Sequence, residues 1–395
     1  MKTRFSRGAR LLAATSLLLL AAAGVALLPI GCGNSQKTDN PGGPEGDPGT
    51  IKVAFLGLTC EAPIFVAHEK GMFTEQGINV EIVKTDWDGL REGLASGNFH
   101  ANHTLVMYAL KGIEKSSDIK ITAGVHTGCL RVQVGTKSTI KHASELKGKK
   151  IGVPTNVGSP PAMFASRVLA AAGIDPSLDA KQVSLIAFPP EQLGQRLEQG
   201  EIDAIATTDP LGTILEGKKI VKTIADQAKD APYADEYCCA VIVNGAFAKK
   251  YPAAAAKVTK GILKGAKWVQ ENPKAAAELG VAKKYVAASV EINTQALSML
   301  KYTPGVSRGK RSVELAAADM KNAKLLGAST DPALLARRAW LDLDGVTDEW
   351  VTAQVVERVP GGGRPVPMKA ESFAALFDLK GECVCCTRCC MDKPW

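Results

Sequence analysis

The stretch that decides the fold reads IGVPTNVGSPPAMFASR and covers residues 151–167. Its first residues are apolar, which predicts a short strand, and Pro154 closes that strand because proline cannot donate to a strand ladder. Asn156 and Gly158 tolerate a turn, and Ser159 is a good helix N-cap before a proline at the first helical position. The stretch therefore predicts strand, turn and helix, the repeating unit of an α/β sheet.

The predicted helix start is a candidate ligand site, because free N–H groups and the positive end of a helix would point at a small polar molecule. Two consecutive prolines remove two of the amides, which leaves Gly158, Ser159, Ala162 and Met163 as donors. We expect Asn156, Gly158 and Ser159 to contact the ligand. An ordinary βα turn without a ligand is the open alternative.

The first 31 residues are predicted to be an export signal peptide. A basic segment (residues 2–10) precedes an apolar run (residues 11–28), and the sequence LPIG before Cys32 resembles a bacterial lipobox. Pro29 stands where that box usually has leucine, so a plain cleavable signal is the alternative to lipidation of Cys32. Residues 32–50 are rich in Pro, Gly and Asp and predict a flexible tether. We expect an exported, lipid-anchored protein in the periplasm or on the outer face of the cytoplasmic membrane.

The length and net charge of the chain limit which functions and domain organisations are compatible with the sequence. The chain has 395 residues and a net charge of +8, part of which belongs to the basic leader. It has no Lys/Arg block interleaved with aromatic residues, so we expect no nucleic-acid partner. More than 300 residues follow the tether, which is enough for two lobes with separate cores.

Strands and amphipathic helices alternate from residue 51 onward, which predicts an α/β fold with a largely parallel sheet. We expect lobe 1 to comprise residues 51–134 plus 236–352 and lobe 2 to comprise residues 135–235. Crossings near residues 131–135 and 236–243 would form a hinged cleft. Residues 353–395 read as a Gly/Pro linker and a cysteine-rich tail.

Ligands of such sheets bind beyond the carboxyl ends of the strands. The residues predicted at these ends are small, polar or soft, and they are our ligand-binding candidates: Thr59, Cys60, Trp87, Asn102, His103, Thr104, His126, Cys129, Asn156, Gly158, Ser159, Thr208, Asp209 and Cys238.

Four ordered motifs carry a family resemblance: APIFVAHEKGMFTEQGINVEIV (62–83), ELKGKKIGVPTNVGS (145–159), LEQGEIDAIATTDP (197–210) and NGAFAKKYP (244–252). They resemble the substrate-binding proteins of nitrate/sulfonate/taurine-type ABC importers, a family related to the thiamine-pyrimidine-synthesis proteins. The resemblance implies a type II periplasmic-binding-protein fold, capture of a small anionic or polar solute, delivery to the membrane subunits of an ABC permease, and neither catalysis nor a cofactor.

The resemblance also indicates which loops would hold the solute. They contain Thr59, Cys60, Trp87, residues 102–104, Gly158, Ser159, Thr208 and Asp209. The sequence places no arginine in the cleft, which weakens a sulfonate assignment because arginine is the usual bidentate partner of such oxygens. Arg131 is interpreted as a hinge residue and Arg167 as a helix-surface residue.

The cysteines leave alternatives open. Cys60, Cys129, Cys238 and Cys239 could form disulfides or stay as buried thiols, or some of them could bind a soft metal or thiophilic solute with His103 or His126. Strand alternation predicts that at most one of Cys238 and Cys239 faces the cleft.

The tail sequence CVCCTRCC offers further candidate metal ligands, which are Cys383, Cys385, Cys386, Cys389 and Cys390. A tail cross-linked by oxidation is the alternative. An enzyme like the related fungal pyrimidine synthases, which use a cysteine cluster and a histidine, is the contrasting functional class.

Overall fold

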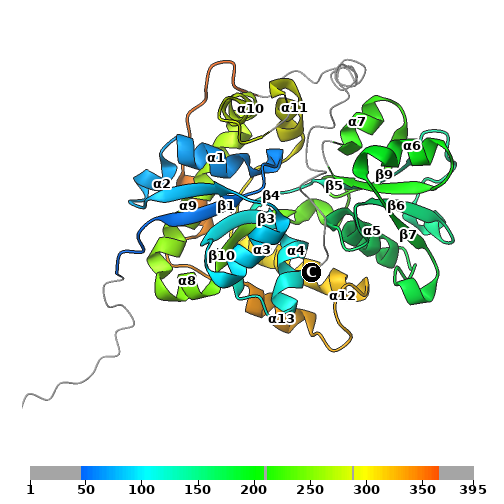
Figure 1. The fold of residues 1–395 in the computed structure, drawn as a ribbon, viewed down its shortest axis with the longest axis horizontal. Helices are drawn as coiled ribbons and strands as arrows, with labels where there is room; N and C mark the ends of the chain where they lie inside the picture. Colours follow the sequence, from blue (N-terminus) through cyan, green and yellow to red (C-terminus); the bar gives the residue numbers. More distant parts are fainter. Residues whose placement is uncertain (1–45, 209–210, 287–288, 364–395) are drawn as a thin grey trace, which may run out of the picture. The chain divides into compact units, whose positions relative to one another are not determined.

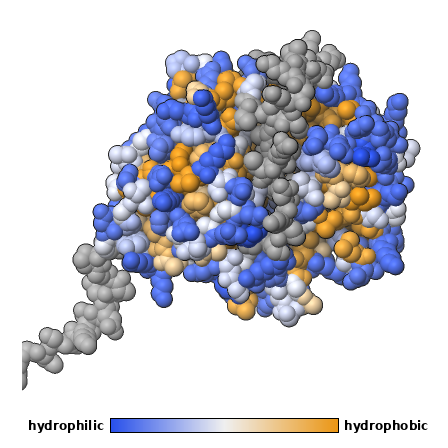
Figure 2. Space-filling view, viewed as in Figure 1, coloured by the Kyte–Doolittle hydropathy of each residue, from blue (hydrophilic) through white to orange (hydrophobic). Residues whose placement is uncertain are grey.

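The computed structural model describes residues 46–208, 211–286 and 289–363, and these ranges contain two five-stranded sheets with helices around them (Figure 1). The predicted signal peptide, Cys32, Asp209 and the cysteine-rich tail lie outside the described residues. No helix in the described ranges has the length and apolar character needed to cross a bilayer. Figure 2 shows hydrophilic residues over much of the viewed face, with hydrophobic ones interspersed.

The first sheet has the strand order β2-β1-β3-β10-β4. Its strands are β1 (Ile51–Phe55), β2 (Val80–Lys84), β3 (Ala101–Leu105), β4 (Ile119–His126) and β10 (Cys239–Asn244). Strand β10 runs antiparallel between β3 and β4, while β1 pairs in parallel with β2 and β3. The strand that returns from the second sheet is therefore built into the interior of the first.

The helices in the sequence segments that surround these strands are α1 (Ala62–Glu69), α2 (Met72–Glu75), α3 (Trp87–Ser96), α4 (Val106–Glu114), α8 (Gly245–Lys250), α9 (Pro252–Glu271), α10 (Pro273–Ala282), α11 (Val290–Met299), α12 (Ser307–Asn322), α13 (Pro332–Ala339) and α14 (Asp348–Ala353). From residue 252 to residue 353 the described chain is mainly helical.

The second sheet has the order β7-β6-β8-β5-β9. It contains β5 (Leu130–Gly135), β6 (Lys150–Pro154), β7 (Ser184–Phe188), β8 (Ala204–Thr208) and β9 (Val221–Asp226), with α5 (Pro160–Ala171), α6 (Leu193–Glu198) and α7 (Leu211–Gly217). Strand β5 is antiparallel to β8 and β9. The predicted α/β fold class is confirmed, but the sheets are not largely parallel, because two of the four strand pairings in each are antiparallel.

The chain passes between the sheets earlier than expected. The segment predicted as the first crossing, residues 131–135, is part of β5, so the passage lies at residues 127–129. The second passage lies at residues 227–238, since β10 already belongs to the first sheet. Residues 130–134 alternate between apolar and polar side chains, which is the pattern of a strand. A lobe boundary after residue 134 would therefore separate β5 from the other strands of the second sheet.

The stretch from residue 151 folds as predicted. Strand β6 ends at Pro154, and the Ser159 side chain accepts a hydrogen bond from the Ala162 N–H at 3.4 Å to cap α5. Gly173 follows the helix with φ +77°, a backbone conformation that favours glycine. Nearly all of α5 is buried.

The helix cap gives a modest stability prediction. Ser159→Ala should lower the free energy of unfolding by about 0.5–1 kcal/mol, because the cap hydrogen bond is lost. Chemical denaturation followed by circular dichroism measures this value. Ser329→Ala serves as the control, since Ser329 is exposed in a turn outside the helices. An equal loss in both variants would contradict the capping role.

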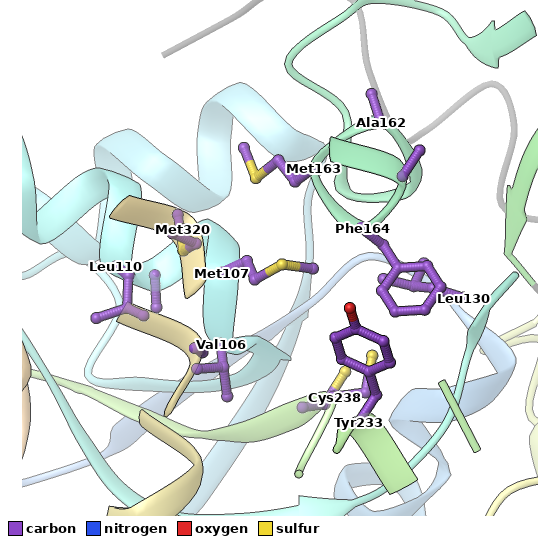
Figure 3. Packing of buried hydrophobic residues seen from close by; sticks show 14 of the residues in the cluster. Val106, Met107, Leu110, Leu130, Ala162, Met163, Phe164, Tyr233, Cys238 and Met320 are labelled. Carbon is purple, nitrogen blue, oxygen red and sulfur yellow. The ribbon is translucent and has the colours of Figure 1, made fainter. Parts of the chain in front are cut away.

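One hydrophobic cluster continues from the first sheet's helices to the second sheet. Met107 and Leu110 of α4 belong to the same buried cluster as Leu130 of β5 and Phe164 of α5. Figure 3 shows the Met107 side chain pointing from α4 toward Phe164, whose ring lies across from that of Tyr233. The centroids of these two rings are 5.1 Å apart. The two sheets therefore share apolar packing beside the passages that connect them.

Arg167 is not the helix-surface residue that the sequence suggests. It is 2% exposed, and its guanidinium contacts Glu236 at 2.7 Å and Asp319 at 2.9 Å. Burial raises the pKa of Glu236, although Arg167 opposes that shift. Because the residues belong to α5, the second passage and α12, this ion-pair network ties the two halves of the molecule together.

Candidate functional site

A mostly apolar pocket of about 50 Å³ lies where segments of both sheets meet. Residues of the first sheet's segments line it together with residues from the first passage, the start of α5 and the end of β8. They are Leu58, Thr59, Cys60, Trp87, Leu105, Cys129, Leu130, Pro160, Pro161, Thr208, Cys239, Ala296 and Leu300. One water needs about 10–15 Å³ of such volume. The pocket in this state therefore has room only for a molecule of a few non-hydrogen atoms.

A buried carboxylate fixes the loop that presents Thr59 and Cys60. Glu61 is 1% exposed, and its side chain accepts hydrogen bonds from the backbone N–H groups of residues 56–58 at 2.9–3.0 Å. The Thr59 hydroxyl donates to Asn293 of α11 at 2.6 Å. The loop after β1 is thus held from within and from α11, which gives the pocket a preorganised wall.

Five of the predicted ligand-binding residues line this pocket: Thr59, Cys60, Trp87, Cys129 and Thr208. Trp87 stands at the start of α3, with its ring 4.7 Å from that of Tyr108 in an edge-on contact. The α11 segment, through Ala296 and Leu300, is a wall that sequence reasoning missed. Apolar residues so far along the chain from the loop after β1 carry no local signal of such a role.

The turn at residues 156–159 contributes differently from the prediction. The N–H of Gly158 donates to the Asn156 side chain, and that of Ser159 donates to the Asn156 carbonyl. The N–H groups of Ala162 and Met163 both donate to Ser159. All four predicted donors are therefore used inside the turn, and the two prolines at 160 and 161 are the residues of this segment that line the pocket.

Residues 102–104 lie within β3 rather than after it, so their side chains alternate between two faces. The Asn102 side chain donates to the Ala54 carbonyl, and Thr104 lines a separate cavity of about 10 Å³. The ring of His103 instead lies beside His126, with the two ring centroids 5.1 Å apart. Of the three, only His103 joins the group of residues behind the pocket.

Four cysteines and two histidines gather at the back of the pocket, and none of the four forms a disulfide within the described ranges. The sulfurs of Cys129, Cys238 and Cys239 lie within 4.8 Å of one another. A ring nitrogen of His103, one of His126 and the Cys239 sulfur form a second such set. The cysteine side chains reach this place from the loop after β1, the first passage, the end of the second passage and the start of β10.

The prediction for the adjacent cysteines holds only in part. Cys239 lines the pocket and Cys238 does not, as alternation suggests. Both sulfurs nevertheless lie beside that of Cys129, because Cys238 precedes β10 and is not bound by strand alternation. Cys129 itself has φ 142°, a backbone conformation that is rare for a residue with a side chain.

Burial and neighbouring thiols shift the protonation of this cluster. A hydrogen bond with Cys239, opposed by burial and assisted by His126, lowers the pKa of Cys60 to about 7. Burial opposes protonation of His126, but the nearby Cys129 and Cys60 raise its pKa to about 10. Burial lowers the pKa of His103 well below its ordinary value. The surroundings therefore favour a negative charge on the Cys60 thiol and a positive charge on the neighbouring His126 imidazole.

Neither arginine considered from the sequence lines the pocket. Arg131 lies on β5 with Asp226 at 3.5 Å and Glu216 at 3.4 Å, and Arg167 is held by the network described above. Among the described residues that line the pocket, none has a positively charged side chain. A strongly charged oxyanion would therefore find no ion-pair partner on these walls.

Comparisons with known proteins agree with this architecture. A model of the NMT1-like family matches residues 45–286. The nitrate/nitrite binding protein NrtA of Nostoc sp. is 26% identical over 247 residues, covering 57% of this chain and 50% of that protein. The bicarbonate-binding protein CmpA of Synechococcus elongatus is 22% identical over 249 residues, covering 56% of this chain and 54% of that protein. The chain thus spans about half the length of these two relatives.

Among solved structures, the periplasmic nitrate-binding protein NrtA from Synechocystis matches with a TM-score of 0.60 at 19% identity. The match covers 84% of this chain and 98% of that one. At this level of identity the likeness shows the fold, which is that of the periplasmic binding proteins, and the predicted type II fold is confirmed.

Proposed function

The chain belongs to the NMT1-like family, and from this membership we propose that it is an exported solute-binding protein that delivers a small solute to an ABC permease. The observation that carries the proposal is the pocket that both sheets line, since it lies where the chain passes from one sheet to the other. Two lobes joined by two passages can close around a molecule held there. Binding then selects the closed state, because only that state lets both lobes touch the solute.

We further propose that Thr59, Cys60, Trp87, Cys129 and Thr208 contact the solute. The first three come from the first sheet's segments, Cys129 comes from the first passage and Thr208 from the second sheet, so each lobe supplies part of the wall. Lipidation of Cys32 would tether the protein to the outer face of the cytoplasmic membrane, beside the permease. The protein would act by binding alone, without catalysis or a cofactor.

A thermal-shift screen tests the proposal. The probes are nitrate, bicarbonate, sulfonates and thiamine-pyrimidine analogues, each with and without reductant. A solute present at 100 times its Kd should raise the free energy of unfolding by about 2.7 kcal/mol, because it binds only the folded state. Chemical turnover of a stabilising compound would contradict the binding function in favour of an enzyme.

Trp87 offers a test of the pocket wall. Trp87→Ala should weaken the binding of a solute found in the screen by at least about tenfold, or about 1.4 kcal/mol, because it removes an apolar wall. Titration calorimetry measures the loss. Trp350→Ala is the matched control, since Trp350 lies in α14 and contacts Lys260 rather than the pocket. Equal affinities in the two variants would place the solute elsewhere.

A further inference from the structure

The histidines behind the pocket lack the partners that buried imidazoles need. His103 is 2% exposed, and neither of its ring nitrogens has a hydrogen-bond partner among the described residues. His126 is fully buried, and its Nε2 also finds no partner in the described part of the chain. A buried polar atom that stays unsatisfied is unfavourable, because it has given up its hydrogen bonds to water. The fold therefore keeps two imidazoles in a place where a ligand would supply the missing interactions.

The thiols beside these imidazoles complete a set of soft donors. Cys239 belongs both to the three-sulfur set with Cys129 and Cys238 and to the set with His103 and His126. The Cys129 sulfur is also 3.9 Å from the Nδ1 of His126. Thiolate and imidazole together are the ligands that zinc and Cu(I) prefer over hard cations.

The cluster is open to an arriving ion from one side. Cys129 and Cys239 line the pocket as well as belonging to the three-sulfur set, so the pocket connects an entering ion with the cluster. The walls carry no positively charged side chain among the described lining residues. A cation that enters the pocket therefore meets no positively charged side chain among these lining residues.

We propose that this cluster is a binding site for a thiophilic d10 cation, held by Cys129, Cys238 and Cys239 with the imidazoles of His126 and His103 as nitrogen donors. As the bonds to the metal form, the thiols and the His126 imidazolium release their protons to solvent. The inference rests on the proposed function only in taking the pocket as the route by which a ligand enters. It names the ligand class that the back of this pocket selects.

The test uses the full-length chain with every cysteine outside the cluster changed to serine, at positions 32, 383, 385, 386, 389 and 390. Purified without oxygen, this protein is incubated with Cu(I) or Zn(II) and passed through a desalting column before elemental analysis. We expect at least one equivalent of one of the two ions to stay bound and the melting temperature to rise. Competition with a chelator of known affinity then gives Kd for each ion and decides between them.

Two variants locate the site. Cys129→Ser combined with Cys239→Ser should weaken binding of the retained ion by more than about tenfold, as should His103→Leu. Thr104→Val is the matched control, because Thr104 is the neighbour of His103 in β3 but lines a different cavity. Its affinity should be unchanged. The melting temperature of each metal-free variant is recorded, so that a loss of folding is not taken for a loss of ligands.

A further variant lacks all four cluster cysteines, at positions 60, 129, 238 and 239. The proposal is overturned if the parent protein retains no more Cu(I) or Zn(II) than this variant does. Equal affinity in the parent and in a folded Cys129/Cys239 double variant would overturn it as well. Both outcomes leave the solute-binding function standing, since that function is tested separately by the response to nitrate, bicarbonate, sulfonates and pyrimidine analogues.

Discussion

Arg167→Met should lower the free energy of unfolding by about 3–5 kcal/mol, because it leaves the buried carboxylate of Glu236 without its cation. Glu236 is 1% exposed and accepts hydrogen bonds of 2.7 and 2.8 Å from Arg167. The change also removes the ion pair between Arg167 and Asp319, so α5 loses this polar contact with α12. Urea denaturation of parent and variant measures the difference.

An exposed ion pair provides the control for this prediction. Arg358 contacts Glu271 at 2.7 Å, but its side chain is 80% exposed. Arg358→Met should therefore change stability by no more than about 0.5 kcal/mol. If both variants lost a similar free energy of unfolding, burial would not be the reason why the Arg167 ion pairs stabilise the protein.

The loss caused by Arg167→Met should depend on pH. Burial already raises the pKa of Glu236 in the native protein, and removing Arg167 removes the group that opposes this shift. A folded-state pKa above the unfolded value near 4.5 means that the native state of the variant binds the proton more tightly. Binding of this proton stabilises the folded variant at pH values below the unfolded pKa. The stabilisation is lost as the pH rises through the raised folded-state pKa. Parent and variant should differ less at about pH 4.5 than at about pH 7.

Gly124→Ala should destabilise the protein by about 1–3 kcal/mol through overpacking. A Cβ at Gly124 of β4 would lie 2.1–2.4 Å from three ring atoms of Tyr237. That ring is buried, and its hydroxyl donates to the Thr303 carbonyl, so it has little room to move. Because Tyr237 immediately precedes Cys238, the clash should also disturb the cluster behind the pocket.

Gly135→Ala is the matched control, since Gly135 is also a strand residue and a Cβ there meets no atom of the described residues within 4 Å. We expect this variant to match the parent or exceed its stability slightly, because alanine loses less backbone entropy on folding than glycine. Thermal unfolding of both variants separates steric crowding from a general intolerance of glycine replacement. Equal stability of the two variants would contradict the close packing of Tyr237.

Local signals in the sequence are enough for the elements that carry strong caps and breakers. The strand, turn and helix around Ser159 are predicted correctly because proline, glycine and an N-cap residue occur there at the right spacing. The family motifs then lead to the correct fold. The same reasoning places Thr59, Cys60, Trp87, Cys129 and Thr208 at strand or helix ends, and the structure brings these five together.

Other features depend on contacts that no local pattern reports. Residues 131–135 could be a linker or a strand, and only their pairing with β8 and β9 makes them part of β5. Arg167 has helical neighbours that suggest a surface position, but Glu236 and Asp319 meet it from distant segments. The sequence predicts that the amides of the turn and of the helix start are free to bind a ligand. In the structure they donate to Asn156 and Ser159 instead.

Hydrogen exchange with and without a stabilising ligand tests the central claim most directly, because it reports which backbone amides a bound molecule protects. We predict that added protection is concentrated in the loop at residues 58–61, the passage at residues 127–129 and the first amides of α5, at residues 162 and 163, which come from both lobes. Protection of one lobe alone, or of a surface away from these three segments, would contradict binding between the lobes.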